Sequence, residues 1–99
     1  MSRRRVQPRK ASICRVTVFC EDQTGFPIQQ RGLLEDRSLS GIGISVPEAI
    51  AIGTKVRVRG RARELLGIVR YCRVKGAEYL VGVRLDDPDT GWASIGAGL

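Results

Sequence analysis

The sequence starts with a run of cations whose spacing suits the binding of a compact anion. Arg5 and Arg9 are separated by three residues in RRRVQPR, residues 3–9. Pro8 lacks an N–H and keeps the preceding residue out of helical dihedrals, so this stretch is expected to be extended. The two arginines then point the same way, with Cα atoms about 13 Å apart. Their guanidinium forks can hold a dianion from opposite sides, although a solvated basic tail also explains the pattern taken alone.

A second stretch, DRSLSG at residues 36–41, offers groups that complement these cations. Asp36 provides a carboxylate acceptor, Ser38 a hydroxyl that donates and accepts, and Gly41 a backbone without a side chain. The alternative interpretation is structural: a short turn in which Asp36 caps backbone N–H groups. An Asp and a Ser two residues apart activate no nucleophile by themselves, so the stretch indicates binding rather than catalysis.

The residue types argue against an enzyme and against a metal or cofactor site. The chain has no His, so a Ser or Cys nucleophile lacks its commonest base, and the usual zinc patterns are missing. GIGISV begins like a dinucleotide-binding fingerprint, but Val46 replaces the third glycine and no helix is expected after it. The GTK at residues 53–55 lacks the upstream glycine of a Walker A loop. We therefore predict a binding protein without catalytic residues, metal or cofactor.

Length and charge indicate one small domain with an anionic partner. The 99 residues are enough for a single modest core. The formal net charge is +7, and 14 of the 17 cations are Arg, whose planar fork grips phosphate and stacks on flat rings. No apolar run reaches the roughly 18 residues of a membrane span. Three cysteines without a CxxC are expected to be buried free thiols in a reducing cytoplasm.

Six segments with strand-like sequence must position these groups. In ASICRVTVFC, four alternate residues share one face: Cys14, Val16, Val18 and Cys20. This geometry keeps the two cysteines roughly 20 Å apart, too far for a disulfide. The other predicted strands are QQRGLLED, GIGISV, TKVRVRGRAR, ELLGIVRYCRV and EYLVGVRL, with Gly67 marking a bulge or bend. EDQTGFP and KGA are predicted turns, and PEAIAIG a connection with room for one helical turn.

Short strands joined by short turns, without a helical period, predict an all-β fold. The expected architecture is a six-stranded antiparallel barrel, closed or split. We place this barrel at residues 11–87, after a flexible basic N-terminal arm (residues 1–10) and before a short C-terminal tail (residues 88–99).

Together, the two stretches resemble the PilZ domain family, whose members are known as receptors for the bacterial second messenger cyclic di-GMP on a six-stranded β-barrel. The RxxxR of residues 5–9 stands before the first strand, and the DxSxxG of residues 36–41 stands between two later strands. Their order and separation match the family's two motifs. The likeness extends over residues 4–85 and includes GVRL, which is similar to the family's closing Gly-Val-x-aromatic strand with Leu85 in the aromatic place.

The resemblance implies a role for each motif residue. Arg5 and Arg9 would hold the phosphates and the guanine edges or faces of cyclic di-GMP, as arginine binds guanine O6 and N7 in DNA. Asp36 would accept from guanine N–H groups or orient an arginine. Ser38 would donate to a phosphate or accept from a base. Gly41 would let the chain turn sharply and approach the ligand closely.

The resemblance also implies a switch. Arg4 precedes the first motif, and in similar proteins a cation there contacts a second, intercalated ligand, so one or two bound cyclic di-GMP molecules are compatible with the sequence. Crowded arginines in the free arm repel one another, and a ligand with two phosphates would neutralise them and order the arm against the barrel. The signal would pass to a downstream effector protein or through the chain's own oligomer; a monomer or a dimer is expected.

Two other functions compete with cyclic di-GMP binding. KVRVRGRAR, residues 55–63, would suit a small basic barrel that binds RNA or single-stranded DNA, but only five aromatic residues are available for base stacking. We expect this strand to be a solvated outer face, which disfavours nucleic acid as a partner. The other alternative is a PilZ-like adaptor that acts only through protein–protein contacts. Complete ligand motifs favour direct binding over it.

Overall fold

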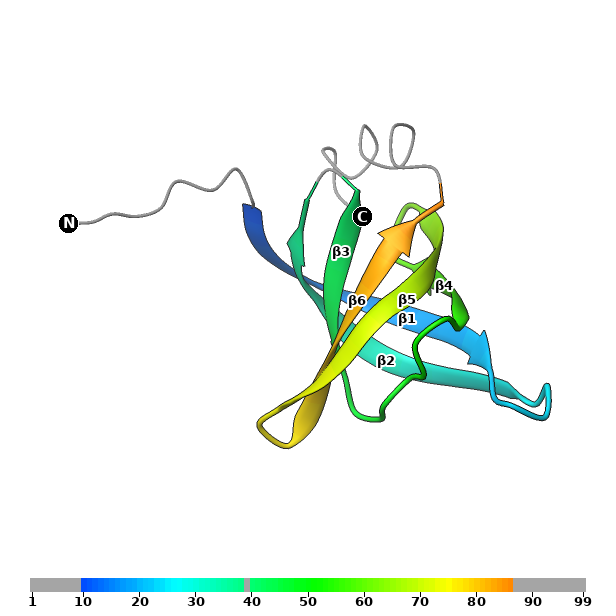
Figure 1. Cartoon of the computed structure of the whole chain (residues 1–99). Coiled ribbons are helices and arrows are strands. Elements are labelled where there is room, and N and C mark those ends of the chain that lie inside the picture. The colour runs from blue at the N-terminus through cyan, green and yellow to red at the C-terminus, as the bar shows by residue number, and fades with distance from the viewer. Residues whose placement is uncertain (1–9, 39, 87–99) are drawn as a thin grey trace.

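The computed structural model describes residues 10–38 and 40–86, which form six β-strands. They are β1 (Lys10–Glu21), β2 (Pro27–Arg37), β3 (Gly41–Val46), β4 (Lys55–Arg59), β5 (Glu64–Lys75) and β6 (Glu78–Leu85). All paired strands are antiparallel, and the order β1-β2-β3-β6-β5-β4 closes where β4 pairs with β1 (Figure 1). The prediction of an all-β, six-stranded antiparallel barrel is confirmed, in its closed form.

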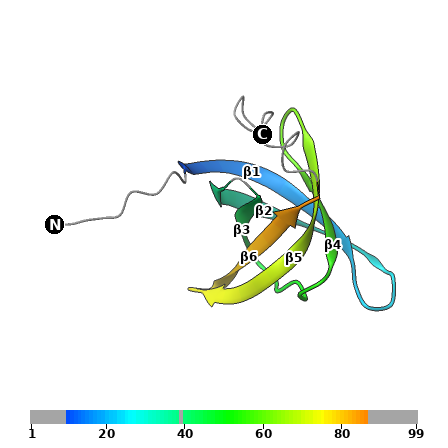
Figure 2. The ribbon, with the colours of Figure 1, turned by 45° about the horizontal axis from the view of Figure 1, so that its top comes forward.

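Two long hairpins, β1–β2 and β5–β6, extend from the barrel (Figure 2). The predicted turn EDQTGFP joins the first pair. The Asp22 carboxylate accepts hydrogen bonds from the Thr24 N–H at 2.8 Å, the Thr24 hydroxyl at 2.7 Å and the Phe26 N–H at 2.9 Å. These bonds, the hydroxyl of Thr24 first, hold the pKa of Asp22 below its usual range. Gly25 supplies the positive φ of 87° that the turn requires.

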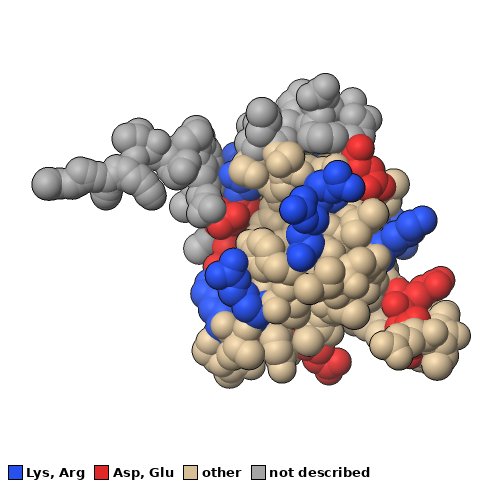
Figure 3. Space-filling view, in the orientation of Figure 1, with Lys and Arg blue, Asp and Glu red and all other residues tan. Residues whose placement is uncertain are grey.

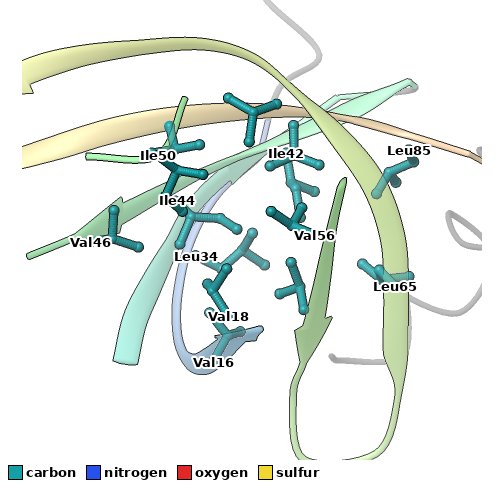
Figure 4. Packing of buried hydrophobic residues seen from close by; sticks show 14 residues of the cluster. Val16, Val18, Leu34, Ile42, Ile44, Val46, Ile50, Val56, Leu65 and Leu85 are labelled. Atoms are coloured by element: carbon teal, nitrogen blue, oxygen red, sulfur yellow. The ribbon is translucent and has the colours of Figure 1, made fainter. Parts of the chain in front are cut away.

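One apolar cluster with contributions from all six strands fills the barrel (Figure 4). Strand alternation produces it, because every second residue of β1, β3, β4 and β6 points inward. The connection after β3 adds one more side chain, Ile50. The buried members are Val16, Val18, Leu34, Ile42, Ile44, Val46, Ile50, Val56, Val58, Leu65, Val69, Val81, Val83 and Leu85.

The three cysteines pack at the margin of this cluster. Cys14, Cys20 and Cys72 are free, as expected, but they are only partly buried rather than fully enclosed. Burial raises the pKa of the Cys14 and Cys20 thiols, which keeps both in the less reactive protonated form.

Three local features differ from the sequence prediction. Gly67 is not at a bulge: it pairs in register with both β4 and β6, and a side chain there would collide with the backbone of Arg84. The register shift in β5 lies at Arg70 instead. Residues 47–54 form bends and a turn rather than a helical turn. The Arg-rich strand ends at Arg59, because residues 60–63 make the tight turn into β5.

Candidate functional site

One cross-strand row on the outside of the barrel connects the DRSLSG stretch to β5. Asp36 pairs with Gly43 on β3, Gly43 with Gly82 on β6, and Gly82 with Tyr71 on β5. Along their strands the two glycines alternate with buried Ile and Val residues, so the row faces outward. Four neighbouring strands therefore bring a carboxylate and an aromatic ring to one surface, with two residues that lack side chains between them.

β-Bulges at both ends of the row turn Asp36 and Tyr71 outward. Simple alternation from the buried Leu34 and Val69 would place both side chains inside the barrel. Instead, the register shifts between Leu34 and Asp36 in β2, and again between Val69 and Tyr71 in β5. Bulges re-aim side chains in this way and are common next to functional sites.

Gly43 and Gly82 form the floor of the row, here called the glycine floor. The Asp36 carboxylate lies over Gly43, where an added Cβ would be 2.9 Å from Oδ1. The Tyr71 ring lies over Gly82 in the same way. The Arg73 guanidinium covers the Tyr71 ring, with Cζ 4.6 Å from the centroid. The two glycines thus allow both side chains to lie directly against the sheet.

The turn after Asp36 is anchored to β6. The Ser38 N–H donates to the Gly41 carbonyl oxygen at 2.8 Å, and the Leu85 N–H donates to the Ser40 oxygen at 3.0 Å. A Cβ at Gly41 would lie only 2.7 Å from the Val83 oxygen. Positive φ angles among the described glycines occur at other positions. Close packing on β6 therefore accounts for the glycine, without the positive φ that some turns require.

These residues border an open pocket of about 250 Å³ on the outer face of the barrel. Its lining includes Asp36, Ser38 and Gly41 from the DRSLSG stretch, and Arg70, Tyr71 and Arg84 from β5 and β6. Lys and Arg side chains are exposed over β5 and β6 in the space-filling view (Figure 3). Two arginines against one carboxylate give the pocket a positive balance, which favours an anionic ligand.

Comparison with models of known protein families identifies the family of this chain. The PilZ domain model matches residues 3–93, which is most of the chain. The chain belongs to the PilZ domain family. Among curated proteins, none is similar enough in sequence to count as a match.

The PilZ motif residues predicted from the sequence fall into two groups. Asp36, Ser38 and Gly41 line one pocket. The other three, Arg4, Arg5 and Arg9, lie outside the described residues. The start of β1 is nevertheless informative, because Ala11 pairs directly with Asp36. The chain that carries the first PilZ motif therefore joins the barrel beside the acid of the second.

Sequence reasoning missed the β5 and β6 side of the pocket. Arg70 and Tyr71 belong to no motif, and their place depends on a bulge in β5 that leaves no clear mark in the sequence. Arg84 lies within GVRL, but only as the unspecified residue of that pattern. The glycine floor did leave a signal. An isolated glycine within a strand pattern indicates close approach of a backbone or a ligand, and both Gly43 and Gly82 interrupt otherwise apolar strands.

A larger groove of about 1270 Å³ lies elsewhere on the barrel, between the β1–β2 hairpin and residues 48–51. Its charged lining residues are four acids, Glu21, Asp22, Glu48 and Asp86, and two cations, Lys55 and Arg57. The acidic excess opposes binding of a phosphate ligand, so size alone does not make this groove the PilZ ligand site.

The bulge before Asp36 is held by Glu35. The Glu35 carboxylate accepts hydrogen bonds from the Lys75 ammonium and the Ser45 hydroxyl. These contacts, Lys75 first, hold the pKa of Glu35 below its ordinary value of 4.5. Glu35 thereby connects β2 to Ser45 of β3 and to Lys75 at the end of β5, which lie on the same side of the row that ends in Asp36.

This arrangement predicts a loss of stability in acid. A carboxyl group whose pKa is lower in the folded state stabilises the fold above its unfolded pKa, and this contribution is lost as the pH falls through the folded value. For Glu35 the loss begins near pH 4.5 and continues below it. Glu35→Gln should therefore have a flatter dependence of unfolding free energy on pH between neutrality and acid, measured by urea denaturation. Equal acid sensitivity in both proteins would refute the assignment.

No cluster of metal-ligating side chains is found in residues 10–38 and 40–86. In the same ranges, no helix has the length and apolar character needed to cross a membrane.

Proposed function

We propose that this PilZ domain binds cyclic di-GMP in the pocket that Asp36, Ser38 and the arginines of β5 and β6 line. PilZ domains are generally receptors for this nucleotide. The observation that carries the proposal is the row from Asp36 to Tyr71, which sets an acceptor for guanine beside cations for phosphate. A guanine base presents N–H donors to a carboxylate, and the two phosphates require arginine forks.

The chemistry of each side chain that lines the pocket supports a particular role in binding. Asp36 accepts from guanine N–H groups or orients an arginine, and the Ser38 hydroxyl donates to a phosphate or accepts from a base. Arg70 and Arg84 add positive charge on the opposite side of the pocket. Tyr71 keeps 37% of its surface exposed and offers an apolar edge to a base. Arg5 and Arg9 supply the remaining phosphate and guanine contacts.

We further propose that the ligand orders the N-terminal arm against the barrel. The pocket of about 250 Å³ is smaller than the roughly 300–1,000 Å³ of common small-molecule sites, so a second wall is needed to enclose a dinucleotide. The pairing of Ala11 with Asp36 supports this proposal, because the start of β1 lies beside the acid of the pocket. Amide NMR relaxation should show residues 1–9 becoming more rigid on binding; equal mobility with and without ligand would disprove the switch.

Isothermal titration calorimetry on the intact chain tests the binding proposal. Cyclic di-GMP should produce heat and a saturable isotherm whose stoichiometry distinguishes one ligand from two. Cyclic di-AMP is the matched control, because it has the same cyclic sugar-phosphate backbone but lacks guanine O6 and the N2 donor. We expect it to bind at least about tenfold more weakly, because it cannot form one or more of the hydrogen bonds that guanine makes to charged groups. No heat with cyclic di-GMP at large excess would end the assignment.

Gly43→Ala separates the role of Asp36 from fold stability. The new Cβ would contact the end of the flexible Asp36 side chain, so the carboxylate moves while the sheet remains intact. We expect unfolding free energy to change by less than about 1 kcal/mol, because alanine is no worse than glycine in a strand, and cyclic di-GMP affinity to fall about tenfold. In an Asp36→Ala background the same substitution should have no further effect on affinity. An additive loss would mean that Gly43 acts independently of the carboxylate.

The proposed receptor acts without catalysis, in the cytoplasm. The ordered arm would form a surface that an effector protein or a second copy of the chain recognises. The three free cysteines suit a reducing compartment. Direct ligand binding is favoured over a purely adaptor role because the pocket combines the complete DxSxxG motif with two further arginines.

A further inference from the structure

A second cationic surface lies on the side of the barrel away from the cyclic di-GMP pocket. In the closed strand order, β2, β1 and β4 are consecutive, while the pocket lies mainly on β3, β6 and β5. The outward residues of the first three strands include four arginines, Arg15 on β1, Arg31 on β2, and Arg57 and Arg59 on β4. We call this surface the arginine face.

The strand register places these arginines in adjacent rows. Thr17 of β1 pairs with Arg31 on one side and with Arg59 on the other. Phe19, two residues further along β1, pairs with Arg57. Rows two residues apart are about 7 Å from each other, and strands about 4.8 Å. The long arginine side chains therefore cover a continuous strip across three strands.

Phe19 and Glu64 hold two of the arginines in place. The Arg57 and Arg59 guanidinium carbons lie 4.6 and 5.0 Å from the Phe19 ring centroid. Glu64 accepts from Arg59 Nε at 3.2 Å and lies 3.6 Å from Arg57 Nε. These contacts reduce the rotamer entropy that binding would otherwise cost. One carboxylate between two guanidiniums leaves a net positive charge at this point, although Arg57 also borders the acid-lined groove between the β1–β2 hairpin and residues 48–51.

Further positive charge continues beyond the end of β4. Because Arg59 pairs with Thr17 in antiparallel fashion, the chain after Arg59 runs toward the side of Arg15. The tight turn at residues 60–63 adds Arg61 and Arg63, both exposed. The arginine face thus extends along the barrel rather than forming a compact cluster around one point.

From this arrangement we infer that the arginine face binds single-stranded nucleic acid through its phosphates. A linear polyanion matches a strip of arginines in successive rows, and guanidinium groups also stack on bases. A protein partner fits less well, because the core of a protein interface needs contiguous apolar contact. Here the apolar side chains are separated: Arg57 stands between Phe19 and the exposed Leu66 in the register. This inference does not depend on cyclic di-GMP binding.

Few aromatic residues are present, so base stacking contributes little and binding should be weak, tolerant of sequence and dominated by electrostatics. What the sequence did not reveal is that the Arg-rich strand β4 lies beside Phe19 of β1 and is continued by Arg31 across β1. We expect neutralisation of about four phosphates and hence a slope of log K against log salt concentration of about −3.

Fluorescence anisotropy with labelled oligothymidine and oligouridine tests the inference on the full chain, between about 50 and 200 mM salt. Arg57→Ser/Arg59→Ser should weaken binding at least about tenfold at low salt and reduce the slope by about 1.4. The control, Arg73→Ser/Lys75→Ser, removes the same charge from β5 on the other side and should bind like the parent; circular dichroism must show that it is folded, because Lys75 pairs with Glu35. Glu64→Gln, which frees both guanidiniums, should bind more tightly. The two probes distinguish DNA from RNA, and binding of either supports the inference.

Several outcomes would overturn it. One is the absence of an anisotropy change at low salt with both probes, and another is an equal loss in the two double variants, which would indicate net charge alone. Competition by poly-glutamate as effective as that by unlabelled oligonucleotide would assign the face to acidic proteins instead. Displacement of the oligonucleotide by saturating cyclic di-GMP would mean a shared pocket. Conversely, binding of oligonucleotide by a chain that gives no heat with cyclic di-GMP would sustain this inference while the proposed function failed.

Discussion

Replacing Arg5 and Arg9 together by Ala is expected to abolish detectable binding of cyclic di-GMP. Each charge-assisted contact of a guanidinium with phosphate contributes about 1.5–3 kcal/mol, which corresponds to about 10- to 150-fold in affinity. Removing both should therefore weaken binding by about two to four orders of magnitude, the largest functional effect predicted here. Calorimetry on the parent and the double variant measures it directly.

The control must remove two arginines without touching the pocket. Arg61 and Arg63, in the turn between β4 and β5, are exposed and absent from the pocket lining. Their replacement by Ala changes the net charge by the same amount and should leave cyclic di-GMP affinity within about twofold. If the two double variants lose affinity equally, general electrostatic attraction explains the binding and the RxxxR motif does not.

Leu34→Ala should produce the largest loss of stability. The Leu34 side chain has 0% relative exposure and lies in the centre of the core, opposite Ile44 in the register. Removing a buried leucine side chain costs about 2–5 kcal/mol, through lost burial and the cavity that remains. Because small domains are stable by only about 5–15 kcal/mol, this is a large share of the total. The expected fall in Tm is at least about 8 °C, measured by circular dichroism.

Leu66→Ala provides the matched comparison. The chemical change is identical, but the Leu66 side chain is 55% exposed on the outer face of β5. Its truncation should cost less than about 1 kcal/mol. A similar Tm for the two variants would contradict the assignment of Leu34 to the core.

The barrel could be predicted from the sequence because its strands obey simple alternation. Val16 and Val18 in β1, and Val56 and Val58 in β4, mark the inner face by their spacing alone. The pairing of β1 with β4, which closes the barrel, was harder to predict, because only three residue pairs join these strands, from Thr17–Arg59 to Phe19–Arg57. The count of strands and the short turns indicated closure without indicating which strands would meet.

The pocket was only half predictable. Asp36, Ser38 and Gly41 carry a motif, and their proximity follows from their spacing in the chain. Asp36 faces outward only because a bulge interrupts the alternation after Leu34, and Tyr71 does so for the same reason in β5. A bulge depends on how two distant strands align, so no local pattern specifies it.

Closure of the barrel also limits how this PilZ domain can communicate. Within the described residues each of the six strands has a neighbour on both sides, but the pairing is partial, because β1 pairs with β4 only over Thr17–Phe19 and β2 with β3 only over Leu33–Arg37. Strand addition by a client peptide is therefore blocked in the closed part of the barrel and has a template only along the projecting hairpins. An effector must either pair with such a hairpin edge or recognise side chains, on the outer faces of the barrel or on whatever surface the ligand and the N-terminal arm create together.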